Sequence, residues 1–284
     1  MDLLWLPFSL ATIFFYGLGQ VFAKETRTNA KSATLLVLLG INILVIWAVY
    51  WLIFRDSSAH DSETWIVAII AAVLSGAAYL TYYEALKHGK VSIVGTIAGA
   101  YAPWTVVLAL VFLGESLNLR EGAGVAFVVS SMLLFTYSAG DNGGKRTELL
   151  GIAFAACSLF FWGASAALAK NAIEEIGNTD FIGVYALVVP TMWLAFWFAT
   201  GNRRLELPKS NVRLLEVSFL FLALGGITMY LAIENGNVSI VSPITNLYPI
   251  VTIAVAKVRL KESLSRLQIT ALVFLLVSIL LFSI

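Results

Sequence analysis

Apolar residues fall into long runs that recur along the whole chain and are separated by short polar breaks. A helix that crosses the hydrocarbon core of a bilayer needs about 20 mostly apolar residues, so each run predicts one membrane-spanning helix. The pattern predicts ten such helices: Leu3–Ala23, Thr34–Phe54, Trp65–Leu86, Ser92–Leu113, Gly122–Tyr137, Leu149–Ala169, Phe181–Ala199, Leu214–Ile233, Ser239–Val258 and Leu267–Ile284. Because the breaks are short, consecutive helices are expected to pack as antiparallel neighbours.

Composition supports this pattern. Hydrophobic residues make up 60% of the 284 positions and charged residues 12%, whereas soluble domains contain about 25% charged residues. A chain this apolar has too few polar side chains to cover a soluble surface. The sequence therefore predicts an all-α polytopic membrane protein, with no room for a soluble catalytic domain.

Catalytic and cofactor motifs are not visible in the sequence. The chain has one cysteine, Cys157, and its two histidines, His60 and His88, fall in predicted loops, so neither a disulfide nor a histidine-based metal site is expected. It contains no GxxxxGK[ST] motif, which argues against an ATP-driven pump. We expect no enzymatic activity, no cofactor and, from the net charge of +1, no nucleic-acid partner.

The second half of the chain repeats the first. Residues 91–117 align with residues 238–264 at an offset of 147, with 13 identities in 27 positions, including VSIV at the start and ESL at the end. A weaker match at an offset of 146 relates FYGLGQVFAK (Phe15–Lys24) to FWGASAALAK (Phe161–Lys170). This predicts two five-helix repeats, 1–139 and 149–284, joined by the glycine-rich linker 140–148. Because five is odd, the second repeat is expected to be inverted in the membrane, as in many transporters.

These motifs resemble those of a known family. FYG or FWG in the first helix of each repeat, and VSIV leading through a Tyr/Pro region into GESL or KESL, are similar to the drug/metabolite transporter superfamily. Within it, the ten-helix EamA-type branch is the closest match, and the resemblance covers essentially the whole chain. It implies small-molecule transport, since members of this branch are described as exporters or permeases of amino acids, metabolites and drugs.

The sequence thus predicts a secondary transporter, an exporter or permease of a small metabolite such as an amino acid or an amphipathic compound, working by alternating access between the two repeats. A lipid or lipid-head-group translocator is the alternative, because its cavity would also be aromatic and largely uncharged. A channel or structural protein is a third interpretation and predicts flux that does not saturate. The expected partners are the substrate, the lipid bilayer and, where transport is coupled, a proton or ion. The expected state is a monomer or weak homodimer.

Basic residues, which mark cytoplasmic loops, are distributed unevenly. The breaks after the odd-numbered predicted helices hold 15 of the 18 Lys and Arg residues, and the other breaks hold only Arg55, Arg120 and Lys170. This count predicts a multi-pass protein of the cell (inner) membrane with both termini outside the cytoplasm. The resembling family is usually drawn with both termini inside.

Ionisable residues are scarce within the predicted helices, and each is a functional candidate because a charge in the membrane is costly. Glu84 follows Tyr79, Tyr82 and Tyr83, where a carboxylate beside aromatic faces could hold a cation or relay a proton. An ion pair with Lys87 at the helix end is the structural alternative. The otherwise uncharged interior favours a neutral, zwitterionic or amphipathic substrate.

Prolines interrupt three predicted helices, at Pro103, Pro190, Pro243 and Pro249. Each removes a backbone donor and frees a carbonyl, which a membrane tolerates only beside protein, water or ligand. Pro103 and Pro249 fall within one position of each other in the repeat alignment, next to the matched Tyr101 and Tyr248. Kinks at corresponding places of two repeats predict hinges at a binding site, and a simple packing kink gives the same pattern.

Aromatic and polar residues around these kinks form the predicted substrate site. Besides the residues already named, its members are Tyr16, Thr96, Trp162, Thr245 and Asn246. Six other tryptophans are expected at the membrane interface or facing lipid: Trp5, Trp47, Trp51, Trp65, Trp193 and Trp197. Glu115 and Glu262 of the repeated ESL block are expected to be structural residues at helix starts.

Overall fold

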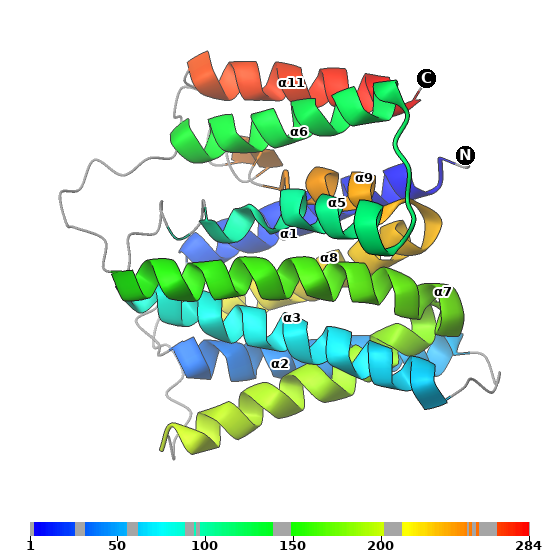
Figure 1. The fold of residues 1–284 in the computed structure, drawn as a ribbon. Coiled ribbons are helices and arrows are strands. Elements are labelled where there is room, and N and C mark those ends of the chain that lie inside the picture. Colours follow the sequence, from blue (N-terminus) through cyan, green and yellow to red (C-terminus); the bar gives the residue numbers. More distant parts are fainter. Residues whose placement is uncertain are drawn as a thin grey trace.

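The computed structural model describes residues 3–25, 32–55, 62–88, 94, 97–138, 149–201, 212–248, 250–251, 254–255 and 266–283, and none of these residues lies in a β-strand. The helices (Figure 1) are α1 (Trp5–Glu25), α2 (Ser32–Phe54), α3 (Ser62–His88), α5 (Tyr101–Phe112), α6 (Leu119–Ser138), α7 (Leu149–Ala199), α8 (Val212–Asn235), α9 (Val238–Thr245) and α11 (Arg266–Ser283). The predicted linker 140–148 lies outside the described residues.

Five helices, α1, α2, α3, α7 and α8, are long and apolar enough to cross a membrane. Helix α7 has 51 residues, which at about 1.5 Å per residue is more than twice the thickness of a hydrocarbon core of about 30 Å. It breaks at Gly177, whose φ of 77° lies in the left-handed region that favours glycine. The described residues thus form an all-helical, multi-pass membrane protein.

The break in α7 is shorter than the sequence predicts. We expected a polar break between Ala169 and Phe181, but the helix continues almost to Gly177. Asn171, Glu174 and Glu175 of this stretch are exposed, but its other charged residues are buried against neighbouring helices instead of forming a solvated loop. Lys170 and Asp180 are each only 8% exposed.

The predicted fourth and ninth helices are both discontinuous. In the fourth, the chain turns just before α5, which begins at Tyr101. In the ninth, α9 ends at Thr245, a turn follows, and helical structure resumes at Ile250. The two turns fall at corresponding places, because Ala100 in the first and Leu247 in the second differ by 147, the offset of the sequence repeat.

Only part of the proline prediction fits these breaks. Pro103 does not interrupt a helix, because it lies in the first turn of α5, where its missing N–H would have no intrahelical partner. Pro190 and Pro243 lie inside α7 and α9, and the backbone of α7 stays helical on both sides of Pro190. Pro249 lies outside the described residues. The hinge roles of these prolines stay predictions.

Equivalent tryptophans of the two halves make equivalent hydrogen bonds. Trp47 Nε1 in α2 donates to Ala223 O in α8 (2.9 Å), and Trp193 Nε1 in α7 donates to Gly76 O in α3 (3.1 Å). The two donors differ by 146 positions and the two acceptors by 147. Both indoles are buried, so the prediction that they face lipid or the interface is wrong. A neighbouring helix carbonyl satisfies each buried N–H. The same correction applies to two more of the six tryptophans, Trp5 and Trp197.

The glycine of the FYG and FWG motifs allows a close helix approach in both halves. A Cβ on Gly17 in α1 would lie 2.9 Å from Tyr248 O, and a Cβ on Gly163 in α7 would lie 3.3 Å from Tyr101 O. Each motif helix therefore packs directly against the broken helix of the other half. This contact gives the repeated motif a physical reason.

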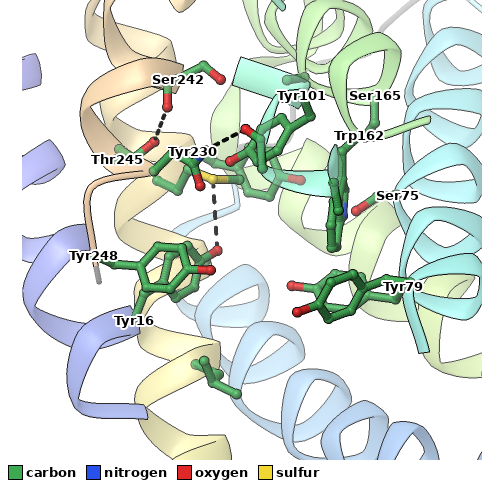
Figure 2. A pocket seen from close by; sticks show the side chains of 18 of the residues that line it. Tyr16, Ser75, Tyr79, Tyr101, Trp162, Ser165, Tyr230, Ser242, Thr245 and Tyr248 are labelled. Carbon is green, nitrogen blue, oxygen red and sulfur yellow. Dashed lines mark hydrogen bonds between the residues drawn. The ribbon is translucent and has the colours of Figure 1, made fainter. Parts of the chain in front are cut away.

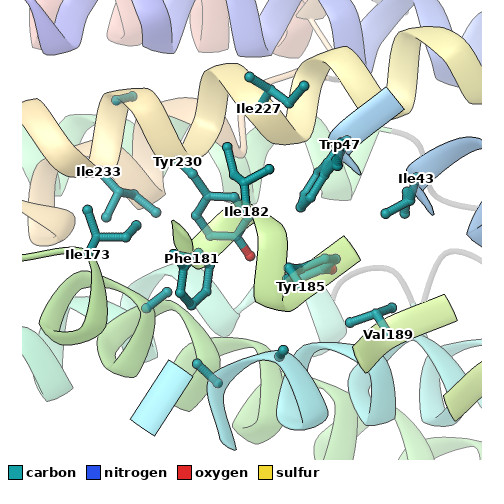
Figure 3. Packing of buried hydrophobic residues seen from close by; sticks show 14 of the residues in the cluster. Ile43, Trp47, Ile173, Phe181, Ile182, Tyr185, Val189, Ile227, Tyr230 and Ile233 are labelled. Atoms are coloured by element: carbon teal, nitrogen blue, oxygen red, sulfur yellow. The ribbon is translucent and has the colours of Figure 1, made fainter. Parts of the chain in front are cut away.

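A buried aromatic cluster joins α2, α7 and α8 (Figure 3). The ring centroids of Phe181 and Tyr230 lie 4.8 Å apart, and those of Trp47 and Tyr185 lie 4.6 Å apart. Helices α6 and α11 pack together at another edge of the bundle (Figure 1), where Ser131 Oγ donates to a carbonyl of α11. The cluster fixes the rings of Tyr185 and Tyr230, which also border the cavity described next.

Candidate functional site

A cavity of about 330 Å³ lies between the helices, lined by α1, α2, α3, α7, α8 and both broken segments. None of the described residues of α6 and α11 lines it. The structure brings nine residues of the predicted site to this cavity: Tyr16, Tyr79, Tyr82, Tyr83, Tyr101, Trp162, Thr245, Asn246 and Tyr248. Figure 2 shows Tyr16, Tyr79, Tyr101, Trp162, Thr245 and Tyr248 among them. Their role in binding stays a prediction.

Among the described residues of the predicted site, one is not brought to the cavity. Glu84 does not line it, and its carboxylate pairs with Lys87 in the last turn of α3. This i, i+3 ion pair stabilises both charges at the helix end, which is the structural alternative that the sequence left open. Thr96 lies outside the described residues.

The sequence prediction also missed several lining residues, among them Trp47, Ser75, Tyr185, Tyr230 and Ser242. Tyr230 is the repeat equivalent of Tyr83, 147 positions apart, so transferring the predicted site through the alignment would have found it. The hydroxyls of Ser75 and Tyr185 lie 2.8 Å apart. No feature of the sequence marks Ser75 or Ser242.

Aromatic rings form two opposite walls of the cavity (Figure 2). On one wall, the centroid of Trp162 lies 5.1 Å from Tyr79, at an interplanar angle of 90°, and 5.7 Å from Tyr101. On the other, Tyr16 and Tyr248 lie 5.9 Å apart at 80°. Edge-to-face contacts of this kind stabilise the ring orientations. The walls are therefore built before any molecule enters.

The two broken helices meet at the cavity. Asn246 Nδ2 donates to Gly99 O over 2.9 Å, so a side chain at the second break satisfies a carbonyl beside the first. The two residues occupy the same position in the repeat. Backbone freed by a break is tolerated in a membrane only where protein or a cavity receives it, and here both conditions hold.

The cavity wall carries no formal charge. No Asp, Glu, Lys, Arg or His is among the described residues that line it. Lys170 comes near, because its Nζ donates to the carbonyl of the lining residue Ile233 over 3.0 Å, but it also pairs with Glu174 at 3.1 Å. Since Ile233 lies in the last turn of α8, the lysine also balances the partial negative charge of that helix end.

The carboxylate of Glu115 fixes the start of α9. Glu115 accepts hydrogen bonds from Val238 N (2.8 Å) and Ser239 N (3.0 Å), the first two residues of that helix. We expected Glu115 at the start of its own following helix, but that place is taken by the reciprocal bonds of Asn118 and Glu121. The ESL block of one repeat thus contacts the VSIV block of the other, 123 residues away. Glu262 lies outside the described residues.

Residues 3–137 and 149–284 each match the sequence profile of the EamA-like transporter family. The chain belongs to this family. Its two EamA-like units coincide with the sequence repeat, which confirms the resemblance and the duplication. Membership in a transporter family also agrees with the absence of catalytic motifs from the sequence.

Two relatives and one solved structure are similar to this chain. An uncharacterized transporter in the cobO 3' region of Sinorhizobium sp. is 30% identical over 136 residues, 94% of that protein and 46% of this chain. An uncharacterized protein of Methanocaldococcus jannaschii is 30% identical over 131 residues, 93% of that protein and 45% of this chain. Each relative therefore corresponds to about one unit. One crystal structure superposes with a TM-score of 0.79 over 97% of this chain and 95% of its own, at 14% identity, and shows the same fold.

Proposed function

We propose that this EamA-like protein is a secondary transporter, an exporter or permease of a small metabolite such as an amino acid or an amphipathic compound. The observation that carries the proposal is the place of the cavity, at the junction of the two units where both broken helices meet. Discontinuous helices in corresponding places are a frequent feature of transporter binding sites. The mixture of aromatic rings with a few hydroxyls and amides is typical of small-molecule pockets.

Alternating access between inverted repeats is the proposed mechanism. In Figure 1, α1 and the first part of α7, which correspond in sequence, run in opposite directions. The matched indole hydrogen bonds and the Asn246–Gly99 contact join equivalent positions, as an approximate two-fold axis requires. Rocking of one unit against the other would open the cavity to each side of the membrane in turn.

The contact between Glu115 and α9 is proposed to belong to one of the two states. It joins the two units at one end of α9, while Ser242 and Thr245 near the other end line the cavity. Breaking it would free the start of α9, and because this helix has only 8 residues, Ser242 and Thr245 of the cavity lining would be free to move with it. The contact would then hold one side of the transporter closed.

Counterflow into liposomes that contain the purified chain tests the proposed function. A saturable uptake of labelled substrate, driven by an excess of unlabelled substrate inside, is expected for a solute transporter. A channel would give flux without saturation or counterflow. A lipid translocator, the alternative from the sequence, would move a fluorescent phospholipid between leaflets and show no counterflow of soluble solutes.

Two variants test the placement of the site. Tyr101→Ala and Tyr248→Ala each remove a ring from the cavity wall, and we expect each to lower the counterflow rate at low substrate concentration about tenfold, through lost aromatic contact. The melting temperature serves as the control for folding. Normal counterflow by both variants would refute this placement.

We propose that both termini lie outside the cytoplasm, on the basis of the 15 to 3 distribution of Lys and Arg. Alkaline phosphatase fused after Ile284 should then be active in a bacterial host, and a green fluorescent protein fused there should be dark. The opposite result, an inactive phosphatase with cytoplasmic fluorescence, would place the termini inside.

A further inference from the structure

The absence of charged side chains from the described cavity wall limits the molecules that the cavity can hold. No ionisable side chain is found among its described lining residues, and the neighbouring Lys170 is already paired with Glu174. An ionised group transferred from water to such a site loses hydration and gains no counter-charge. A carboxylate or phosphate has no partner here, and an ammonium group has only ring faces to replace a carboxylate.

The rings of the wall add a second limit. Among the described residues, ten aromatic side chains line the cavity, eight tyrosines and two tryptophans. Planar rings gain stacking and edge-to-face contacts with such a wall that a saturated ring of equal size cannot make. The volume of about 330 Å³ lies at the lower end of the range for small-molecule pockets, about 300–1,000 Å³.

One hydroxyl of the wall lacks a well-formed hydrogen bond. Ser242 is 4% exposed and lines the cavity, yet its Oγ makes no hydrogen bond of normal geometry to a described residue, although the Tyr101 hydroxyl lies near it. Buried polar groups are normally satisfied, and leaving one unpaired is costly. Ser239, three residues earlier on the same helix, is also buried and unpartnered at its Oγ, but it does not line the cavity.

From these three observations, we infer that the cavity binds a planar aromatic molecule that carries no ionised group, and that Ser242 Oγ hydrogen-bonds a polar group on that molecule. The inference rests on the proposed function and narrows its substrate class. The aromatic walls hold the ring, the uncharged lining disfavours ions, and Ser242 on the short helix α9 hydrogen-bonds the polar substituent.

Four matched probes test the class on the purified full chain by calorimetric titration. Benzamide is aromatic and neutral, cyclohexanecarboxamide is its saturated counterpart, benzoate is an aromatic anion, and benzyltrimethylammonium is an aromatic cation. Benzamide should bind saturably and about fivefold more tightly than cyclohexanecarboxamide. Benzoate and benzyltrimethylammonium should bind at least about tenfold more weakly than benzamide. Equal binding of the two amides, tighter binding of either ion, or no binding of benzamide would overturn the inference.

Two serine variants test the role of Ser242. Ser242→Ala should weaken benzamide binding about fivefold through loss of one hydrogen bond, and Ser239→Ala should leave it unchanged. Melting temperatures should not fall in either variant, because each removes a hydroxyl that makes no hydrogen bond of normal geometry to a described residue. Equal effects of the two substitutions would overturn the assignment. If Ser242→Ala does not fold, the four probes on the unmodified chain still decide the class.

Counterflow separates this inference from the proposed function. Saturable benzamide binding without benzamide counterflow would support the class and refute transport by this site. Counterflow of a charged metabolite, with no benzamide binding, would support transport and refute the class.

Discussion

Glu115→Ala is expected to open the start of α9 and to abolish most of the counterflow. Glu115 accepts two hydrogen bonds from the backbone of this helix, at 2.8 Å and 3.0 Å. Hydrogen bonds to a charged group are each worth about 1.5–3 kcal/mol, so removing both shifts a two-state equilibrium about a hundredfold or more. If only one state makes this contact, the variant will populate the other state and will return slowly to complete the transport cycle.

Cysteine labelling measures that shift directly. Cys157 is the only cysteine of the chain, so Cys157→Ser gives a background free of thiols. In this background, Ser239→Cys places one thiol at a position that is 0% exposed beside the Glu115 contact. The rate of its reaction with a maleimide should rise about a hundredfold in Glu115→Ala. Glu115→Gln keeps one acceptor oxygen, so its maleimide reaction rate should lie between those of Glu115→Ala and of the protein with Glu115 intact.

Glu121 provides the matched control for Glu115. Its carboxylate accepts a hydrogen bond from Asn118 N over 2.8 Å, within the cap of its own helix α6. Glu121→Ala should lower the melting temperature slightly, as loss of a helix cap does, without changing the labelling of Ser239→Cys. Labelling and counterflow that stay normal in Glu115→Ala would contradict a contact specific to one state.

The all-helical membrane fold, the repeat and part of the cavity wall could be predicted from the sequence, because the membrane fixes the length of spanning segments and each repeated motif occurs in both halves. Tyr101 and Tyr248 were found because they match in the repeat and lie beside the breaks. The same alignment relates Tyr83 to Tyr230, which was missed only because the comparison was not extended to α3 and α8.

Which face of a helix is buried could not be predicted from hydropathy. In a membrane protein, both the core-facing and the lipid-facing sides of a helix are apolar, so Trp47 and Trp193 read as lipid-facing although both are buried. Their indole partners lie 176 and 117 residues away. The backbone N–H groups that donate to Glu115 are also remote, at 123 and 124 residues away, and only the packed structure brings such pairs together.

The breaks were predicted at about the right places for a partly wrong reason. Prolines led to the prediction, but Pro103 begins a helix instead of interrupting one. The turns themselves lie at Ala100 and at residues 246–248, and the hydrogen bond from Asn246 to Gly99, beside the first turn, crosses between the two units. The identity of the interrupting residue therefore matters less than the partner that satisfies the freed carbonyl.

Gly17→Ala is expected to lower the free energy of unfolding by about 3 kcal/mol, through overpacking in a rigid contact. The added Cβ would lie 2.5 Å from Val251 Cβ and 2.9 Å from Tyr248 O. Neither atom is the far end of a flexible side chain, so the broken helix itself must move.

Two other glycine variants give changes in stability against which the effect of Gly17→Ala can be compared. Gly163→Ala should destabilise less than Gly17→Ala, because its tightest contact is the side chain of Trp104 and its backbone contact, to Tyr101 O, is longer at 3.3 Å. Gly122→Ala in α6 meets nothing within 4 Å and should raise stability by up to about 1 kcal/mol, the gain of alanine over glycine in a helix. Melting of the three variants in detergent, followed by size-exclusion chromatography, gives the order. If Gly17→Ala and Gly122→Ala have the same melting temperature, the helices need no close approach at the motif glycine. If the order holds, the repeated motif serves to seat each broken helix, and with it Tyr101 or Tyr248, against the cavity.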